Sequence, residues 1–390
     1  MVALDLSKAF ERVEHTLLLK EVAETNLHSN LVRWLRSYLR GRVSYVEYQN
    51  TRSTFRRNHF GVPQGGVISP ILFNFFVRDF PDCAEITVNY ADDFSILESG
   101  VDLAEVEAKL NEDLATIADW ARRKRLYLAP EKSSVTLFSA DTHQFHYHPQ
   151  VFLNGALIPL DRNPKILGIT LDPQLTFGPH ARTVVAKVGA RLKIMKALSG
   201  TDWGHSHEDL EITFKSLVTS VINYGAPIYS PNLKPTHINK IQCAQNHCLR
   251  VVTGAHAAAS LEHLHRETKI LPVGDHLALL ARQFLAQASV SSHPSNSVVS
   301  GDPGRRSHRH TLSTLHGSSV NPFLRGGAIP RDSLRDTLTD LHTAAVACLI
   351  RKLDETPNRV LGYVPPPVDP SSYVTKVMAL FSLSTALGFL

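Results

Sequence analysis

Three acidic residues at the ends of short apolar segments are the first candidates for chemistry in this sequence. Asp5 lies near the end of a largely apolar run at residues 2–6, while Asp92 and Asp93 stand between two segments that each read as a strand. Two adjacent carboxylates at the tip of a tight hairpin repel each other unless a cation neutralises them. Taken alone, however, an Asp at a strand end is more often a helix cap, and an Asp pair is more often an exposed turn.

The order of three sequence blocks favours the metal interpretation. Asp5-x4-Phe10 comes first, residues 61–70 follow with the sequence GVPQGGVISP, and Tyr90-Ala91-Asp92-Asp93 comes last. In this order they resemble motifs A, B and C of reverse transcriptases.

Later segments extend the resemblance. Residues 126–128 (LYL) followed by Lys132 resemble motif D, and residues 165–172 (KILGITLD) resemble motif E, the primer grip. Phe177 and His180, with residues 221–225 (VINYG) further on, resemble the thumb of jockey-like and LINE-like elements. The resemblance covers roughly residues 1–290.

The resemblance implies an α+β fold with the organisation of a right-hand polymerase. A palm, in which an antiparallel sheet is backed by helices, is expected over residues 1–175. A helical thumb or connection is expected over 176–289, and a C-terminal helical segment over 331–390. Between them, residues 290–330 are rich in Ser, His, Pro, Gly and Arg, a composition typical of a low-complexity linker.

The implied function is that of an RNA-directed DNA polymerase of a non-LTR retrotransposon. Such an enzyme transfers nucleotides from dNTPs to the 3′-hydroxyl of a DNA primer on an RNA template. Phosphoryl transfer of this kind uses two Mg²⁺ ions, with Mn²⁺ as an alternative. By resemblance, Asp5 and Asp92 bridge the ions, the Leu6 backbone carbonyl holds the nucleotide-side ion, and Asp93 supports the primer-side ion less directly.

Other positions match residues that contact substrate in the family. Phe10 corresponds to the steric gate that excludes a ribose 2′-hydroxyl, although an ordinary core Phe is the alternative. Gln64 and Gly65 are expected over the incoming nucleotide and template, and Tyr90 near the primer terminus. Lys132 either donates a proton to the leaving pyrophosphate or is a surface lysine.

Basic residues gather in two stretches. Residues 31–60 contain seven arginines and a single acid, Glu47. Residues 179–200 contain five basic residues and no acid, namely Arg182, Lys187, Arg191, Lys193 and Lys196. Such stretches favour a polyanionic partner, and these five side chains are expected to contact template–primer phosphates. A solvated charged face is the alternative interpretation.

The sequence begins almost at the first motif. The fingers segment that precedes motif A in the family, and any endonuclease domain, are therefore expected to be missing from an N-terminally truncated chain. A fingers or endonuclease portion of the same element is accordingly a candidate partner. The alternative function is a catalytically weak or inactive remnant that still binds nucleic acid through its basic residues.

Hydrophobic periodicity predicts the elements that must position these residues. Helices are expected at 7–25, 30–39, 70–80, 103–124, across 179–287 and at 331–353. Strands are expected at 2–6, 86–90, 94–97, within 126–138 and within 151–171, with a hairpin over 43–60.

Composition narrows the class of protein. Because no apolar stretch reaches about 18 residues and the N-terminus does not read as a signal peptide, we expect no membrane span and a location in the nucleus or cytoplasm. The four cysteines are scattered, which suits a reducing compartment. Cys243-x4-Cys248 with His247 and His256 has loose zinc spacing, and we favour an ordinary helix there.

Overall fold

The computed structural model describes residues 1–200, 203–288 and 334–355. They divide into two compact units. Unit 1 comprises Met1–Lys165 with Asp172–Gln174, and unit 2 comprises Ile166–Leu171 and the residues from Leu175 onward. The segment at 290–330, predicted to be a linker, lies outside the described residues. Within the described ranges, no helix combines the length and apolar character needed to cross a bilayer.

The centre of unit 1 is a four-stranded sheet in which all pairings are antiparallel. Its strands are β1 (Val2–Asp5), β6 (Ile86–Tyr90), β7 (Asp93–Leu97) and β8 (Ser134–Val135). They lie in the order β6-β7-β1-β8. Because side chains alternate along a strand, Leu4 and Phe94 are buried on one face while Asp5 and Asp93 lie on the other. The expected α+β class with an antiparallel sheet is therefore confirmed.

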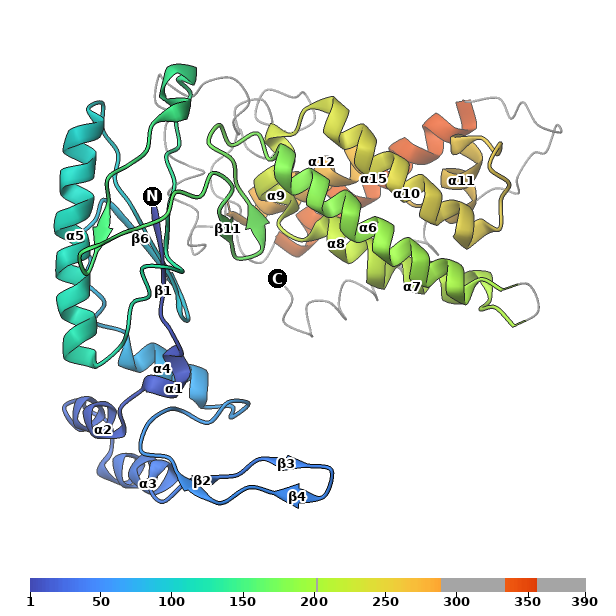
Figure 1. Ribbon diagram of the computed structural model, residues 1–390. Coiled ribbons are helices and arrows are strands. Elements are labelled where there is room, and N and C mark those ends of the chain that lie inside the picture. The colour runs from blue at the N-terminus through green and yellow to red at the C-terminus, as the bar shows by residue number, and fades with distance from the viewer. Residues whose placement is uncertain (201–202, 289–333, 356–390) are drawn as a thin grey trace. The chain divides into compact units, whose positions relative to one another are not determined.

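Within unit 1, helices cover the apolar face of this sheet. Helix α5 (Leu103–Lys124) runs along it, as Figure 1 shows at the left of the molecule. It begins at the Asp102 cap, whose carboxylate accepts from the Ala104 N–H, and ends at Arg125 in a left-handed conformation. Trp120 is fully buried against Phe80 and Phe94. The core of unit 1 therefore lies between the sheet, α5 and α4 (Ser69–Phe76).

The single helix expected at 7–25 is wrong, because the chain forms two helices there. These are α1 (Ala9–Arg12) and α2 (His15–Ala23). The break falls where Val13 accepts a hydrogen bond from the Gly61 N–H at 2.7 Å and Glu14 pairs with Phe60. A long-range backbone pairing thus replaces the helical hydrogen bonds that the local sequence favours.

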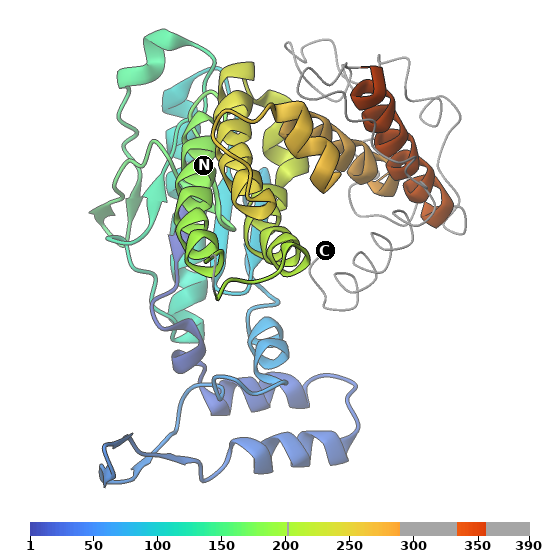
Figure 2. The same ribbon diagram turned by 90° about the vertical axis from the view of Figure 1, so that its right-hand side faces the viewer.

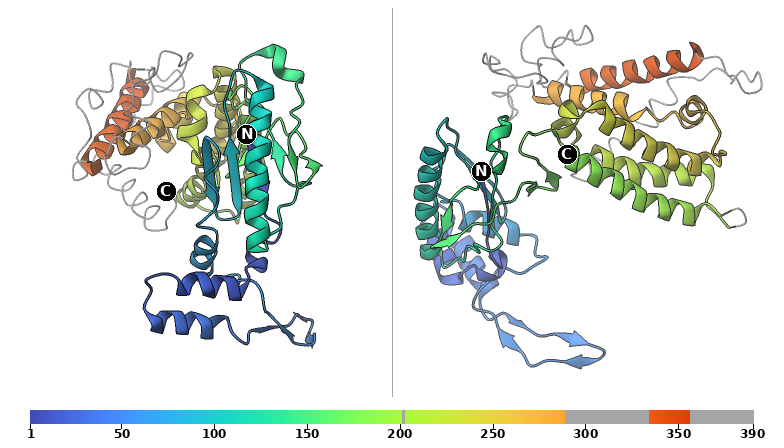
Figure 3. Two further views of the ribbon diagram at one scale, coloured as in Figure 1. Left: turned by 90° about the vertical axis from the view of Figure 1, so that its left-hand side faces the viewer. Right: turned by 45° about the horizontal axis from the view of Figure 1, so that its top comes forward.

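A long hairpin follows α3 (Ser29–Leu39), and its tip projects from unit 1 (Figures 1 and 3). Gln49 and Asn50 both have positive φ, which gives the tight two-residue turn that hairpins prefer. The hairpin expected over 43–60 is confirmed. Its strands are β2 (Val43–Ser44), β3 (Glu47–Tyr48), β4 (Thr51–Arg52) and β5 (Arg56–Arg57).

The strands expected within 126–138 and 151–171 are much shorter than predicted. Apart from β8 they form only two-residue pairs, separated by turns such as the one at Asn154 and Gly155. These pairs are β9 (Phe152–Leu153) with β10 (Ala156–Leu157) and β11 (Lys165–Ile166) with β12 (Ile169–Thr170). Apolar residues that suggested long strands are instead buried in the core of unit 1 outside any strand, as Val151 and Ile158 are.

Unit 2 is helical, as expected for residues 179–287. Helix α6 packs along α10, and α12 packs against α15, as Figure 2 also shows. α7 continues through a π-helical turn into α8. The helices are α6 (Gly178–Leu198), α7 (His207–Phe214), α8 (Ser220–Asn223), α9 (Ala226–Tyr229), α10 (Pro235–Thr253), α11 (Leu261–Thr268), α12 (Val273–Ala288) and α15 (Leu334–Glu355).

Candidate active site

Asp5 and Asp93 are direct cross-strand neighbours. Asp5 is the last residue of β1, Asp93 is the first of β7, and the two strands pair them in register. Directly opposed side chains of an antiparallel pair point to the same face of the sheet. The sequence places these acids 88 residues apart (93 − 5), and the sheet brings them together.

The hydrogen-bonding pattern shows which kind of pair they form. The Asp5 N–H donates to Ser133 Oγ at 3.2 Å, and the Asp5 carbonyl accepts from the Ala129 N–H at 3.0 Å. Both backbone groups of Asp5 therefore point away from β7. Asp5 and Asp93 thus form a non-hydrogen-bonded pair, the type in which opposing Cα atoms are only about 4.5 Å apart and side chains are closest.

Ser133 helps to hold this arrangement, and no pattern in the sequence marks it as important. Its side chain is 1% exposed, accepts from Asp5 and donates to the Ala129 carbonyl at 2.8 Å. The turn at residues 129–133 is closed by the Lys132 N–H donating to the same carbonyl. This buried hydroxyl, together with the Ala129 N–H, holds the end of β1 against the turn.

Asp92 lies in the two-residue turn between β6 and β7. Its neighbour Ala91 has a φ of 53°, a conformation in which an L side chain is strained. Partial burial raises the pKa of the Asp93 carboxyl, and the charges of Asp92 and Asp5 raise it further. The three acids therefore interact electrostatically at one end of the sheet.

Cationic groups compensate this cluster only weakly. Lys132 Nζ lies 4.0 Å from Asp5 Oδ2, and its side chain is 59% exposed. Among the described residues, no group of three or more His, Cys, Asp or Glu side chains is already gathered as a metal site. The donor set nevertheless suits a divalent cation, because opposed carboxylates at an open sheet face offer oxygen ligands and excess negative charge.

Phe10 lies on α1, the helix that follows Asp5 in the chain, and is partly buried. Its ring stacks on Phe73 of α4 with the centroids 4.4 Å apart. Its carbonyl accepts from the Val62 N–H, which ties α1 to the Gly61–Pro70 region. The stacking on Phe73 is sufficient to explain why an apolar residue stands at position 10. The position of Phe10 on the helix that follows Asp5 is also compatible with the predicted steric gate.

Gln64 and Gly65 form the exposed part of a tight turn. The Gly66 N–H donates to the Pro63 carbonyl, and Gly65 has a φ of +79° that favours glycine. A side chain at Gly65 would meet nothing within 4 Å, so open space lies above it. By contrast, a side chain at Gly66 would meet the Tyr38 hydroxyl at 3.0 Å. Sequence reasoning missed this contact.

Tyr90 shares the open face of the sheet with the acids. It pairs in register with Asp93, and its side chain is 65% exposed. Ile86 and Val88 follow on the same face of β6 and are about half exposed. An aromatic ring therefore adjoins the acidic cluster within unit 1, followed by an apolar row.

The five basic residues of α6 do not share one face. At 100° per residue, Arg182, Lys193 and Lys196 fall within about 60° of arc, opposite the buried residues. Lys187 and Arg191 lie about 140° and about 180° from Arg182. Arg191 is half-buried, and its Nε has no hydrogen-bond partner. The exposed basic stripe of α6 is thus narrower than the sequence implied.

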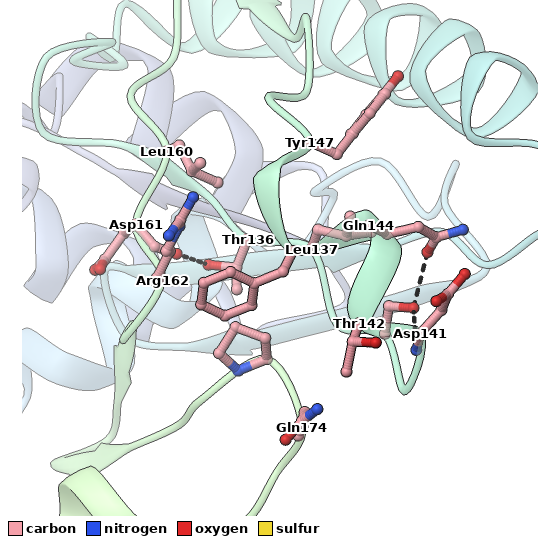
Figure 4. A pocket seen from close by; sticks show the side chains of 13 residues that line it. Thr136, Leu137, Asp141, Thr142, Gln144, Tyr147, Leu160, Asp161, Arg162 and Gln174 are labelled. Carbon is pink, nitrogen blue, oxygen red and sulfur yellow. Dashed lines mark hydrogen bonds between the residues drawn. The ribbon is translucent and has the colours of Figure 1, made fainter.

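A small pocket in unit 1 lies among residues other than the predicted site residues. Figure 4 shows its lining, to which Thr136, Gln144, Asp161 and Arg162 contribute. The Thr136 hydroxyl donates to the Asp161 carbonyl at 2.7 Å, and Arg162 lies over the Phe145 ring. Its polar groups are thus engaged with one another, and we assign it no part in the chemistry.

The loose zinc spacing falls on helix α10, as expected. Cys248 is fully buried in the core of unit 2, while Cys243 is exposed. Burial raises the pKa of the Cys248 thiol to about 12, so it is protonated at neutral pH. Cys248 is a core residue, and no metal group forms there within the described chain.

Comparison with known proteins agrees with the motif order. The family described as Reverse transcriptase (RNA-dependent DNA polymerase) matches residues 1–171. The RNA-directed DNA polymerase from mobile element jockey of Drosophila melanogaster is 29% identical over 80% of this chain and 36% of its own length. The probable RNA-directed DNA polymerase from transposon BS of the same species is 29% identical over 71% of this chain and 31% of its own length.

A further relative extends the agreement to a second species. The jockey polymerase of Drosophila funebris is 28% identical over 75% of this chain and 32% of its own length. The chain thus spans about a third of the length of these curated relatives. Reverse transcriptases generally use divalent metal ions, which agrees with the acidic end of the sheet. Residues 1–171 thus match the reverse transcriptase family, and the chain is similar to the RNA-directed DNA polymerases of jockey and other non-LTR elements of Drosophila.

Proposed function

We propose that this chain carries the polymerase site of a reverse transcriptase and extends a DNA primer with dNTPs on an RNA template. The observation that supports this most strongly is the Asp5–Asp93 pair, with Asp92 in the adjoining turn. Two opposed carboxylates have no structural reason to face each other, because like charges directly across a sheet are destabilising. A bound cation would neutralise this repulsion, so cation binding explains why the two carboxylates face each other.

In this proposal unit 1 is the palm and unit 2 the thumb of a right-hand polymerase. Asp5 and Asp92, with the Leu6 carbonyl and with Asp93 in a less direct role, would hold two Mg²⁺ ions at this end of the sheet. When bound, the ions stabilise negative charge on the attacking and leaving oxygens. Ser133 holds the backbone of Asp5 in place through its 3.2 Å hydrogen bond.

The remaining residues position the substrates. Phe10, held by its stacking on Phe73, closes the space that a ribose 2′-hydroxyl needs. The open side of the turn at Gln64 and Gly65 receives the nucleotide and template. Tyr90 packs near the primer terminus. Lys132, whose Nζ lies 4.0 Å from Asp5 Oδ2, gives a proton to the leaving pyrophosphate.

Contacts with nucleic acid come from basic side chains, which bind phosphates without reading sequence. We assign the exposed stripe of α6, with Arg182, Lys193 and Lys196, to the template–primer duplex. Lys187 and Arg191 contribute less, because both point away from this stripe and Arg191 is half-buried.

The test is primer extension by the purified chain, on an RNA template with a DNA primer, dNTPs and Mg²⁺. We expect template-directed products that depend on the divalent ion. A parallel anisotropy measurement records binding of the same primer–template at several salt concentrations. Salt-dependent binding without extension would instead support a remnant that only binds nucleic acid. Absence of both would contradict either function.

A further inference from the structure

The hairpin at residues 43–57 has two chemically different faces. Its pairings place Tyr45, Glu47 and Arg52 on one face, while Val46, Tyr48 and Arg56 lie on the other. Two residues separate Ser44 from Glu47, but three separate Arg52 from Arg56, so the second strand carries one extra residue. Such a bulge changes the side to which the following side chains point.

The bulge brings two aromatic rings together. Phe55 lies against Tyr45 edge to face, with the ring centroids 5.1 Å apart. The Arg52 guanidinium lies 5.2 Å from the centre of the Tyr45 ring, and Arg57 follows in register with Val43. We call Tyr45, Phe55, Arg52 and Arg57 the stacking face.

The stacking face is accessible. Tyr45 is 42% and Phe55 67% exposed. The hairpin packs against no other strand of unit 1, because the sheets β2–β5 and β3–β4 each contain two strands. Large aromatic rings that are exposed to solvent on a projecting hairpin indicate a binding surface.

The charge of the segment indicates which partner. Residues 31–60 carry seven arginines and one acid, and that acid, Glu47, already pairs with Arg52 at 3.1 Å. Aromatic rings interleaved with arginines on a strand surface suit unpaired nucleic acid, whose bases stack on the rings while phosphates meet the guanidinium groups. A duplex offers phosphates but keeps its bases stacked inside.

The stacking face also connects to the proposed polymerase site. Tyr38 on α3 has its hydroxyl beside Gly66, next to the Gln64–Gly65 turn. The Tyr38 ring stacks on Trp34 and lies 5.2 Å from the Arg42 guanidinium at the base of the hairpin. Aromatic and arginine side chains thus continue from that turn to the hairpin.

We propose that the stacking face binds a single-stranded segment of nucleic acid, with bases packed on Tyr45 and Phe55. That this strand is the template approaching the Gln64–Gly65 turn rests on the function proposed above, whereas the binding itself does not. The proposal is therefore tested without polymerisation.

The experiment measures anisotropy of labelled 12-nucleotide probes: oligo-uridine RNA, oligo-thymidine DNA and a blunt duplex. Phe55→Leu keeps an apolar contact with Tyr45 but removes the stacking ring. We expect it to weaken binding of single strands by about ten-fold, within the range for one lost stacked base, and to change duplex binding by less than about two-fold. Tyr48→Leu, an equally exposed aromatic on the opposite face, is the matched control and should change neither.

A second pair of variants distinguishes binding on one face of the hairpin from general attraction by its positive charge. Arg57→Gln and Arg56→Gln remove the same charge from neighbouring residues on opposite faces. We expect the first to weaken single-strand binding more than the second. Equal losses would show general attraction to phosphates and overturn the proposal, as would equal effects of Phe55→Leu and Tyr48→Leu.

Cross-linking of a 5-bromouridine oligomer to the unaltered chain is independent of any variant's folding. Adducts on the peptide that contains Tyr45 or Phe55 support the proposal. Adducts that avoid residues 43–57 contradict it and leave the hairpin as a surface for protein. If Phe55→Leu weakens the binding of RNA and DNA single strands alike, the stacking face recognises unpaired bases. If it weakens only the binding of RNA, the face also contacts the 2′-hydroxyl.

Discussion

Asp5 and Asp93 face each other as a non-hydrogen-bonded pair across β1 and β7, held there because both backbone groups of Asp5 bond to the turn at Ala129 and Ser133. This pairing places two negative charges at the closest approach that an antiparallel sheet allows. Under the proposed function, a bound divalent cation offsets this repulsion. Its consequences can be measured.

Replacing Asp93 with Asn should stabilise the protein when no divalent ion is present. Removing repulsion between exposed cross-strand charges is expected to raise the free energy of unfolding by a few tenths to about 1 kcal/mol at low salt. Asp5→Asn should give a similar gain, and the double variant less than the sum. Urea unfolding of the four proteins provides the comparison, and strictly additive gains would argue against the pairing.

The same gain should depend on pH. Burial and then the charges of Asp92 and Asp5 raise the pKa of Asp93 above its ordinary value of 3.8. Ionised Asp93 therefore costs stability, and the cost grows as pH rises through the folded-state pKa. Below the ordinary value the carboxyl is protonated in both states, so the unaltered protein and Asp93→Asn should become equally stable.

Phe10→Val should admit ribonucleotides while leaving most of the dNTP activity. The smaller side chain opens the space near the sugar, so the preference for dNTP over rNTP in single-nucleotide extension should fall by at least about ten-fold. Phe73→Leu disturbs the same stacked pair from its buried side and serves as the control. If both variants keep the original preference, Phe10 is an ordinary core residue.

Tyr224→Phe should loosen the hairpin of β11 and β12. The Tyr224 hydroxyl donates to the Leu167 carbonyl at 2.5 Å, and its ring lies over Gly168. Losing this bond should cost about 0.5–1.5 kcal/mol locally and speed amide hydrogen exchange at residues 165–170. Tyr229→Phe, whose hydroxyl bonds to Ile222, should leave exchange at these amides unchanged. Identical exchange in Tyr224→Phe would show that the hydroxyl does not hold the hairpin.

Neutralising the exposed stripe of α6 should lower the salt dependence of duplex binding. Each phosphate contact adds about 0.9 to the slope of log affinity against log salt, so Arg182→Gln with Lys193→Gln should reduce the slope by about 2. Lys215→Gln is the control, because Lys215 is paired with Glu211 at 2.5 Å. A slope that stays constant in the double variant would place the duplex elsewhere.

The sequence predicted elements well where local signals agree. Helix α5 has its bounds as expected, because Asp102 caps it and apolar residues recur at helical spacing up to Trp120. The β6–β7 hairpin is confirmed because two apolar runs flank a short polar turn. The approach of Asp5 to the same turn followed from motif order rather than from any local pattern.

Features that depend on distant contacts could not be predicted. The break between α1 and α2 is caused by pairing with Phe60 and Gly61, about 46 residues away. The role of Ser133 depends on a turn that folds back to β1, and nothing in its neighbourhood marks it. For α6, the angular positions of Lys187 and Arg191 follow from the sequence alone. Which side of the helix is buried does not, so the exposed stripe could not be recognised in advance.

Primer extension across a series of Mg²⁺ concentrations, with the unaltered chain and Asp92→Asn, tests the central claim most directly. Asn keeps the size of the side chain but lacks the negative charge that binds a divalent cation. Asp119→Asn removes the same charge from an exposed ion pair with Arg122 and is the control for a general effect of charge. We predict Mg²⁺-dependent extension by the unaltered chain and Asp119→Asn, and a loss of at least about 100-fold in Asp92→Asn with primer–template binding retained. Extension by Asp92→Asn at the unaltered rate would contradict the assignment of the acidic cluster as the catalytic centre.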